Sequence, residues 1–136
     1  MTTVDAMAPR SIDDLLEQAR RSLVRVTVDE AARSMASGGL LVDIRPVEQR
    51  QRDGEVPGAL IIDRNVLEWR LDPQGDHRIP DAARTDRHVM VLCNEGYASS
   101  LAAATLRQLG LDATDVVGGF VAWSAAGLPV EPLSGT

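Results

Sequence analysis

Cys93, the single cysteine of the chain, is the residue whose type and position most directly suggest chemistry. The apolar run at residues 89–92 predicts a buried strand before it, and residues 99–109, rich in alanine and leucine, predict a helix after it. The thiol is therefore expected where a strand ends and a tight turn leads into a helix. In an open α/β sheet, this carboxyl edge is where ligands bind.

The backbone N–H groups of such a turn predict a reactive sulfur. A helix N-terminus carries a partial positive charge, and a tight turn adds N–H groups that together form a nest for an anion. Both features stabilise a thiolate, which is the nucleophilic form of cysteine. The alternative interpretation is that Cys93 is a small buried hydrophobic residue at a strand end, a common role for a free cysteine.

The composition excludes several other classes of function. The chain of 136 residues has a net charge of −6 and no basic stripe, so we expect no nucleic-acid partner. No apolar run approaches the length of a membrane span, so we expect no membrane association. All 14 basic residues are arginine, which excludes lysine Schiff-base chemistry. The two histidines are far apart in sequence, so we expect no metal site.

The N-terminus and the cysteine content both predict a cytoplasmic protein. The first residues lack the positive start and apolar core of a secretory signal. One cysteine cannot form an internal disulfide, in agreement with a reducing compartment.

Strands and helices alternate along the chain, which predicts an α/β fold. Five short runs predict strands, at residues 24–27, 40–44, 60–62, 89–92 and 114–117. The helices are expected at residues 28–37, 46–52, 63–70, 99–109, after residue 81 and after the glycine pair at residues 118–119.

The chain is expected to divide into two parts. Residues 1–22 form an N-terminal extension with one amphipathic helix, capped by Ser11 and docked on the rest of the protein. An interaction arm for another subunit is the alternative role of this helix. Residues 23–136 form the main domain, in which Phe120 and Trp123 are expected to anchor the last helix in the core.

Three stretches of this main domain resemble the rhodanese-like sulfurtransferases. The first is LVDIRPVE at residues 41–48, followed by GEVPGA at residues 54–59, where Glu55 and Val56 replace the usual His and Ile. The second is the Cys93 loop, defined here as residues 93–99, and the third is GGFVAW at residues 118–123. The resemblance implies an open five-stranded parallel sheet with helices on both faces.

The resemblance also implies a reaction. A sulfurtransferase of this kind moves a sulfane sulfur from thiosulfate or a persulfide donor, through a persulfide on Cys93, to a thiol or cyanide acceptor. No cofactor is implied, and a protein persulfide is a further candidate partner. Because the chain has no second cysteine, the acceptor must be external. The alternative is a non-catalytic rhodanese-like module that binds a partner or senses persulfides.

In the resemblance, Cys93 is the catalytic residue, and the N–H groups of the Cys93 loop point at its sulfur. Asp43 and Arg45 are expected to support the site structurally, by pairing with nearby charges. Gly96 would adopt a backbone angle that other residues avoid. The loop residues implied to bind substrate are Asn94, Glu95, Gly96, Tyr97, Ala98 and Ser99.

Two positions in the loop bear on the substrate. Family members suited to thiosulfate often carry basic residues there, whereas this chain has Glu95. We expect the Glu95 side chain to point outward, because backbone N–H groups rather than side chains form the anion site of such a loop. The alternative is that its carboxylate lies at the mouth of the active site, where it would repel thiosulfate. Cysteine phosphatases and arsenate reductases need an arginine six residues after the cysteine, and Ser99 occupies that position.

Four further side chains lie on segments that can reach the cleft expected beside Cys93, at the carboxyl edge of the sheet. They are Arg64, Trp69, Arg70 and His77.

Overall fold

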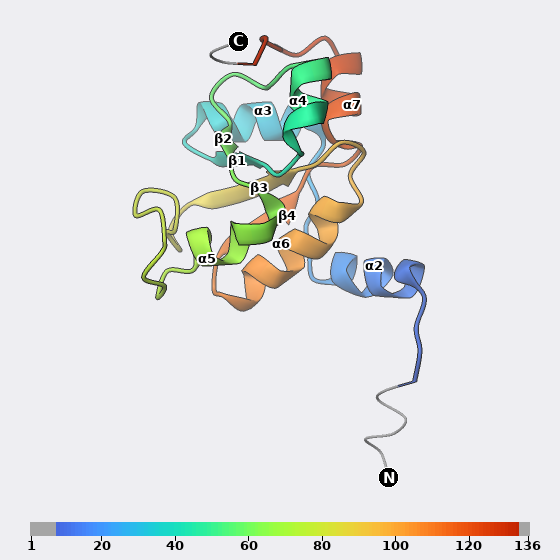
Figure 1. Ribbon diagram of the computed structural model, residues 1–136, viewed down its shortest axis with the longest axis vertical. Helices are drawn as coiled ribbons and strands as arrows, with labels where there is room; N and C mark the ends of the chain where they lie inside the picture. The colour runs from blue at the N-terminus through green and yellow to red at the C-terminus, as the bar shows by residue number, and fades with distance from the viewer. Residues whose placement is uncertain (1–7, 134–136) are drawn as a thin grey trace.

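A computed structural model describes residues 8–133 of the chain. Within this range, four strands form one parallel sheet in the order β2-β1-β3-β4 (Figure 1). The strands are β1 (Leu40–Asp43), β2 (Leu60–Ile61), β3 (His88–Leu92) and β4 (Asp112–Asp115). Asp43 pairs with Leu92, so the carboxyl ends of the two central strands lie side by side. The α/β class and the parallel sheet predicted from the sequence are confirmed.

The predicted number of five strands is wrong for the described residues, because residues 24–27 form only an isolated bridge. Val26 pairs in parallel with Val116, through the bonds Val26 N to Asp115 O (3.1 Å) and Val117 N to Val26 O (2.8 Å). The strand cannot extend further because Thr27 already caps the next helix and accepts a hydrogen bond from Glu30 N.

The helices follow the predicted order with one exception. The segment after residue 81 forms turns, in which Ala82 N and Ala83 N both donate to Ile79 O. The helices are α2 (Ile12–Arg21), α3 (Val28–Ala36), α4 (Val47–Asp53), the 3-10 helix η1 (Arg64–Val66), α5 (Leu67–Leu71), α6 (Ala98–Gln108) and α7 (Gly119–Ala125).

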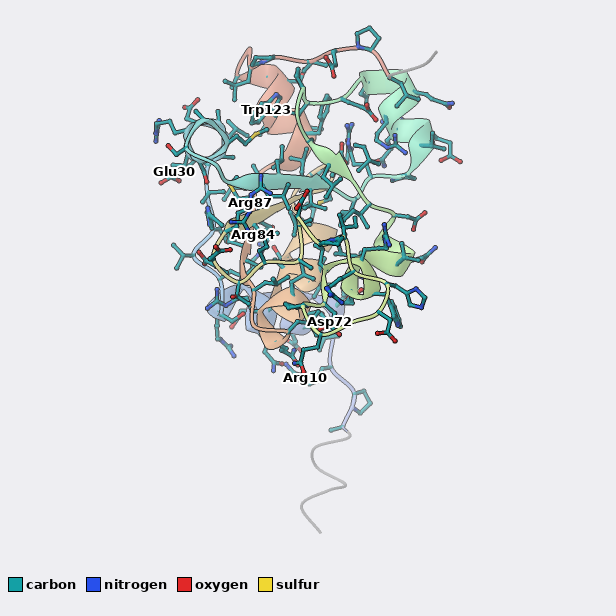
Figure 2. The ribbon with its side chains drawn as sticks, turned by 90° about the vertical axis from the view of Figure 1, so that its left-hand side faces the viewer. Arg10, Glu30, Asp72, Arg84, Arg87 and Trp123 are labelled. Atoms are coloured by element: carbon teal, nitrogen blue, oxygen red, sulfur yellow. The ribbon has the colours of Figure 1, made fainter. Side chains whose placement is uncertain are left out.

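The sheet is covered on both faces, as the sequence predicts. Val89 and Val91 of β3 point to the face packed by α5 and α6, whereas Met90 and Leu92 point to the face packed by α3 and α7. This alternation follows from the two-residue period of a strand. Figure 2 shows Trp123 of α7 on one side of the sheet and Asp72, which follows α5, on the other.

The N-terminal helix α2 lies alongside α6 (Figure 1). Ser11 begins it with a capping box, in which Ser11 Oγ accepts from Asp14 N (3.0 Å) and Asp14 accepts from Ser11 N (3.2 Å). None of its residues is buried. Between residues 8 and 133, no helix is both long enough and apolar enough to span a bilayer.

The start of α7 packs directly against the chain that leaves β3. Phe120 N donates to Cys93 O (2.9 Å) and Val121 N donates to Asn94 O (3.0 Å). Gly119 has φ +59°, and a Cβ there would lie 2.5 Å from Cys93 O and 2.6 Å from Asn94 O. Only glycine permits this approach, which fixes the backbone on both sides of Cys93.

We expect Gly119→Ala to destabilise the protein more than Gly127→Ala does. Gly127 also has a positive φ of +76°, but a Cβ there meets nothing within 4 Å, so it serves as the control for backbone strain. Strain alone costs about 1–2 kcal/mol, and the steric overlap at Gly119 should add roughly 1–3 kcal/mol. Denaturant unfolding of both variants measures the difference; equal losses of stability would contradict the close contact between α7 and the Cys93 loop.

Candidate active site

The sulfur of Cys93 lies inside the turn that joins β3 to α6. Gly96 N donates to Cys93 Sγ at 3.1 Å, and Ser99 N donates to the same sulfur at 3.4 Å. The thiol in turn donates to Ser99 Oγ at 3.2 Å. The Cys93 loop therefore surrounds the sulfur with backbone N–H groups, an arrangement that favours a negative charge on it.

The local sequence explains this turn. Gly96 has φ +89°, and a Cβ there would lie 2.8 Å from Gly118 N, so the position requires glycine. The first N–H groups of a helix lack an intrahelical partner, and Tyr97, the N-cap of α6, provides none through its side chain. Cys93 Sγ accepts one of them, that of Ser99, and thus acts as the cap of α6.

Cys93 lines a pocket of about 420 Å³ at the carboxyl edge of the sheet. The residue is 7% exposed. The pocket is bounded by the loop residues Asn94, Glu95, Tyr97 and Ala98 and, across from them, by Ile44, Arg45, Pro46, Gln49 and Arg64. All the predicted loop residues therefore either line this pocket or donate to the sulfur from its base.

Unpaired polar atoms also mark this pocket. Within residues 8–133, two buried side-chain polar atoms lack a hydrogen-bond partner, Arg45 Nη1 and Asn94 Oδ1. Both residues line the pocket. Because buried polar groups are nearly always paired, these two atoms are candidate donors and acceptors for a bound ligand.

Asp43 and Arg45 form a buried ion pair beside Cys93. Arg45 Nη2 donates to Asp43 Oδ2 (2.8 Å) and to Gly54 O (2.8 Å), and the Arg45 backbone N donates to Asp43 Oδ1 (3.0 Å). The guanidinium carbon of Arg45 lies 3.9 Å from the centroid of the Phe120 ring. The pair holds the chain after β1 in place, where Arg45 forms part of the pocket wall.

A second polar network lies behind the Cys93 loop, centred on the buried carboxylate of Asp115. Ser99 Oγ and Ser100 Oγ donate to Asp115 Oδ2 at 2.7 Å and 2.8 Å. Arg25 donates to both oxygens, with Nε 2.9 Å from Oδ1 and Nη2 3.2 Å from Oδ2. Asp115, Ser100 and Arg25 were not predicted as site residues, although a carboxylate inside a predicted buried strand indicates a paired partner.

The remaining predicted residues divide into two groups. Arg64 lines the pocket, and its Nη1 donates to both carboxylate oxygens of Glu68, at 2.8 Å and 3.0 Å. Trp69, Arg70 and His77 are not among the residues that line the pocket. Arg70 Nη1 instead donates to His77 O (2.5 Å), which holds the loop after α5, and Trp69 is exposed.

The arrangement can hold a sulfur anion next to a cavity of ligand size. Its hydrogen-bond donors are mainly backbone groups. Each of the two guanidinium groups at the pocket, those of Arg45 and Arg64, is paired with a carboxylate. Glu95 is exposed and contributes an acidic residue to the same lining.

Comparisons with known proteins agree on one family. The model of the rhodanese-like domain matches residues 27–126. A search of curated proteins finds no match. Among solved structures, a protein of unknown function from Rhodopseudomonas palustris CGA009, described as a possible tyrosine phosphatase, is 35% identical with a TM-score of 0.83; the alignment covers 92% of this chain and 97% of that one.

Two similar structures are named as sulfurtransferases. A probable thiosulfate sulfurtransferase is 30% identical with a TM-score of 0.63, over 79% of this chain and 47% of that chain. Thiosulfate sulfurtransferase from Pseudomonas aeruginosa is 24% identical with a TM-score of 0.63, over 79% of this chain and 19% of that chain, and supports the fold alone. This chain therefore spans less than half the length of either protein.

The family match extends over most of the chain, and a relative of 35% identity aligns with nearly all of it. The strand–turn–helix around Cys93 and the parallel sheet agree with that match. The chain belongs to the rhodanese-like domain family.

Proposed function

We propose that the protein is a sulfurtransferase that carries a sulfane sulfur as a persulfide on Cys93. The observation that carries the proposal is the position of Cys93 Sγ. It accepts hydrogen bonds from Gly96 N at 3.1 Å and from Ser99 N at 3.4 Å, and Cys93 lines the pocket. A thiolate and a persulfide are both anions, so one set of backbone donors can stabilise both states.

The proposed reaction has two steps. In the first, the Cys93 thiolate attacks the outer sulfur of the donor, an S–S bond forms at Cys93, and the donor's own S–S bond breaks. The electron pair leaves with sulfite when the donor is thiosulfate, or with a thiolate when the donor is an organic persulfide. In the second step, cyanide or a thiol attacks the outer sulfur and restores the Cys93 thiolate.

The charges at the pocket favour an organic persulfide over thiosulfate as the donor. Thiosulfate is a dianion and leaves a second dianion, sulfite, so its binding requires uncompensated positive charge. The charge of Arg45 is balanced by Asp43, although its Nη1 has no hydrogen-bond partner, and the charge of Arg64 is balanced by Glu68. The described lining therefore holds no arginine whose charge is uncompensated. The apolar side chains Ile44, Pro46 and Ala98 suit the carbon skeleton of an organic thiol.

The name of the Rhodopseudomonas palustris relative raises phosphatase chemistry as a competing class. Such an enzyme needs an arginine at the sixth position after the cysteine to bind a phosphate by two hydrogen bonds. Here that residue is Ser99, whose hydroxyl donates to the buried carboxylate of Asp115. The loop therefore lacks the side-chain donor that would hold a phosphate dianion, which argues against this class.

The second alternative is a non-catalytic binding or sensing module. In a module that only binds a partner, Cys93 would need no access to a ligand, so its position at the pocket supports a reactive thiol. A persulfide sensor shares that reactivity and differs from a sulfurtransferase in passing no sulfur on to an acceptor.

We expect Cys93 to take up one sulfur from a persulfide donor. Intact-protein mass spectrometry after incubation with glutathione persulfide should show a single added sulfur that cyanide removes as thiocyanate. Cys93→Ser provides the control and should show no adduct. A wild-type protein that remains unmodified by glutathione persulfide and by thiosulfate would contradict the sulfurtransferase proposal and favour the binding module.

We expect Glu95→Gln to change the rate of persulfide formation from thiosulfate by less than about threefold, because solvent screens an exposed carboxylate. Asp76→Asn removes the same charge from an exposed residue outside the pocket lining and serves as the control. Persulfide formed per unit time, measured as thiocyanate released by cyanide, gives the comparison. A gain of tenfold or more (about 1.4 kcal/mol) in Glu95→Gln alone would show that this carboxylate points at the sulfur.

A further inference from the structure

The carbonyl of Gly96 is held by two arginines from the N-terminal part of the chain. Arg20 Nη2 donates to Gly96 O at 2.8 Å, and Arg25 Nη2 donates to the same oxygen at 3.0 Å. The N–H of Gly96 meanwhile donates to Cys93 Sγ. One residue is thus bonded to the reactive sulfur on one side and to two guanidinium groups on the other.

These bonds determine how the Cys93 loop presents its backbone. Glycine has more conformational freedom than any other residue, so a turn that depends on Gly96 at φ +89° needs external contacts to keep one conformation. The peptide unit is planar and trans, so its N–H points away from its carbonyl. The carbonyl of Gly96 and the N–H of Tyr97 belong to the same peptide unit. Because the two arginines hold Gly96 O, the N–H of Tyr97 points away from them.

Arg20 contacts the Cys93 loop and the start of α6 at three points. Besides Gly96 O, its Nε donates to Ser100 Oγ (3.0 Å), and its guanidinium carbon lies 5.6 Å from the centroid of the Tyr97 ring. Arg20 belongs to the last turn of α2, a helix with no buried residue. The next residue, Arg21, pairs instead with Glu17 on the exposed side of α2.

Arg25 connects the same carbonyl to the buried network behind the loop. Its guanidinium binds both oxygens of Asp115, which also accepts from Ser99 and Ser100. Ser99 is the residue whose N–H and hydroxyl both contact Cys93 Sγ. Arg25 therefore restrains both backbone donors of the sulfur, one directly and the other through Asp115.

Both arginines precede the region that matches the rhodanese-like domain, which begins at residue 27. We propose that Arg20 and Arg25 are positioning residues for the Cys93 loop, so that the segment before the matched domain completes its active site. The charge of Arg25 is balanced by Asp115, whereas the positive charge of Arg20 adds to the stabilisation of a thiolate or persulfide at Cys93. The effect on turnover rests on the proposed sulfurtransferase function, whereas the effect on the reactivity of Cys93 does not.

The test compares Arg20→Ala with Arg21→Ala in the full chain. Each substitution removes one arginine from the last turn of α2, but only Arg20 contacts the Cys93 loop. We expect Arg20→Ala to lower the rate of Cys93 alkylation by iodoacetamide at neutral pH by about five- to tenfold and to shift the pH profile to higher pH. Arg21→Ala should stay within about twofold of wild type at every pH.

Two further variants separate positioning from folding. Arg20→Lys retains the charge but cannot reach Gly96 and Ser100 together through one planar group, so its rate should fall between wild type and Arg20→Ala. Denaturant unfolding identifies any general loss of stability. An Arg20→Ala protein that is less stable but has the wild-type pH profile of alkylation would overturn the proposal, because a merely structural role would leave the sulfur unaffected.

The outcomes also separate this proposal from the proposed function. If wild type accepts sulfur from glutathione persulfide but Arg20→Ala and Arg21→Ala react alike in alkylation and persulfide formation, the positioning role is wrong and sulfur transfer stands. If wild type accepts no sulfur from either donor but Arg20→Ala alone slows alkylation, the positioning role is supported and the sulfurtransferase function fails.

Discussion

Under the proposed function, the structure depends on one electrostatic requirement, which is that Cys93, only 7% exposed, carries a negative charge on its sulfur. Side chains do not supply the donors within hydrogen-bond distance of Cys93 Sγ; the backbone N–H groups of Gly96 and Ser99 do. Backbone donors have fixed positions only if the turn has a fixed conformation. The sheet register, the close approach of Gly119 to Cys93 O, and the start of α6 together provide that conformation. The fold can therefore be understood as a frame for one tight turn.

Two buried ion pairs flank this turn and have different tasks. Asp43 with Arg45 fixes the chain that follows β1 and forms part of the pocket wall, whereas Asp115 with Arg25 lies behind the turn and reaches it through Ser99 and Ser100. A buried pair contributes little net stability but is costly to break, so it specifies one arrangement of the groups around it. Positive charge behind the turn suits an anionic sulfur on Cys93. Balanced charges at the pocket suit a weakly charged ligand.

Much of this site could be predicted from local sequence, because the chemistry lies in a contiguous segment. Cys93 between an apolar run and an alanine-rich helix indicated the strand–turn–helix, and the resemblance to the rhodanese-like family indicated the left-handed residue within it, Gly96. Contacts between distant segments were not visible: Arg20 and Arg25 reach residues more than seventy positions away. The strand expected at residues 24–27 failed for a related reason. Thr27 was counted in this strand, although it caps the helix that begins at Val28, and a capping residue cannot continue the strand.

The most direct measurement is a crystal structure of the protein after reaction with glutathione persulfide. The account predicts one extra sulfur atom bonded to Cys93 Sγ, with N–H groups of the Cys93 loop directed at the sulfur atoms within about 3.5 Å and Gly96 O still bonded to Arg20 and Arg25. A modified Cys93 whose sulfur is held by side chains, with the loop N–H groups turned away, would contradict the claim that the backbone stabilises the anion.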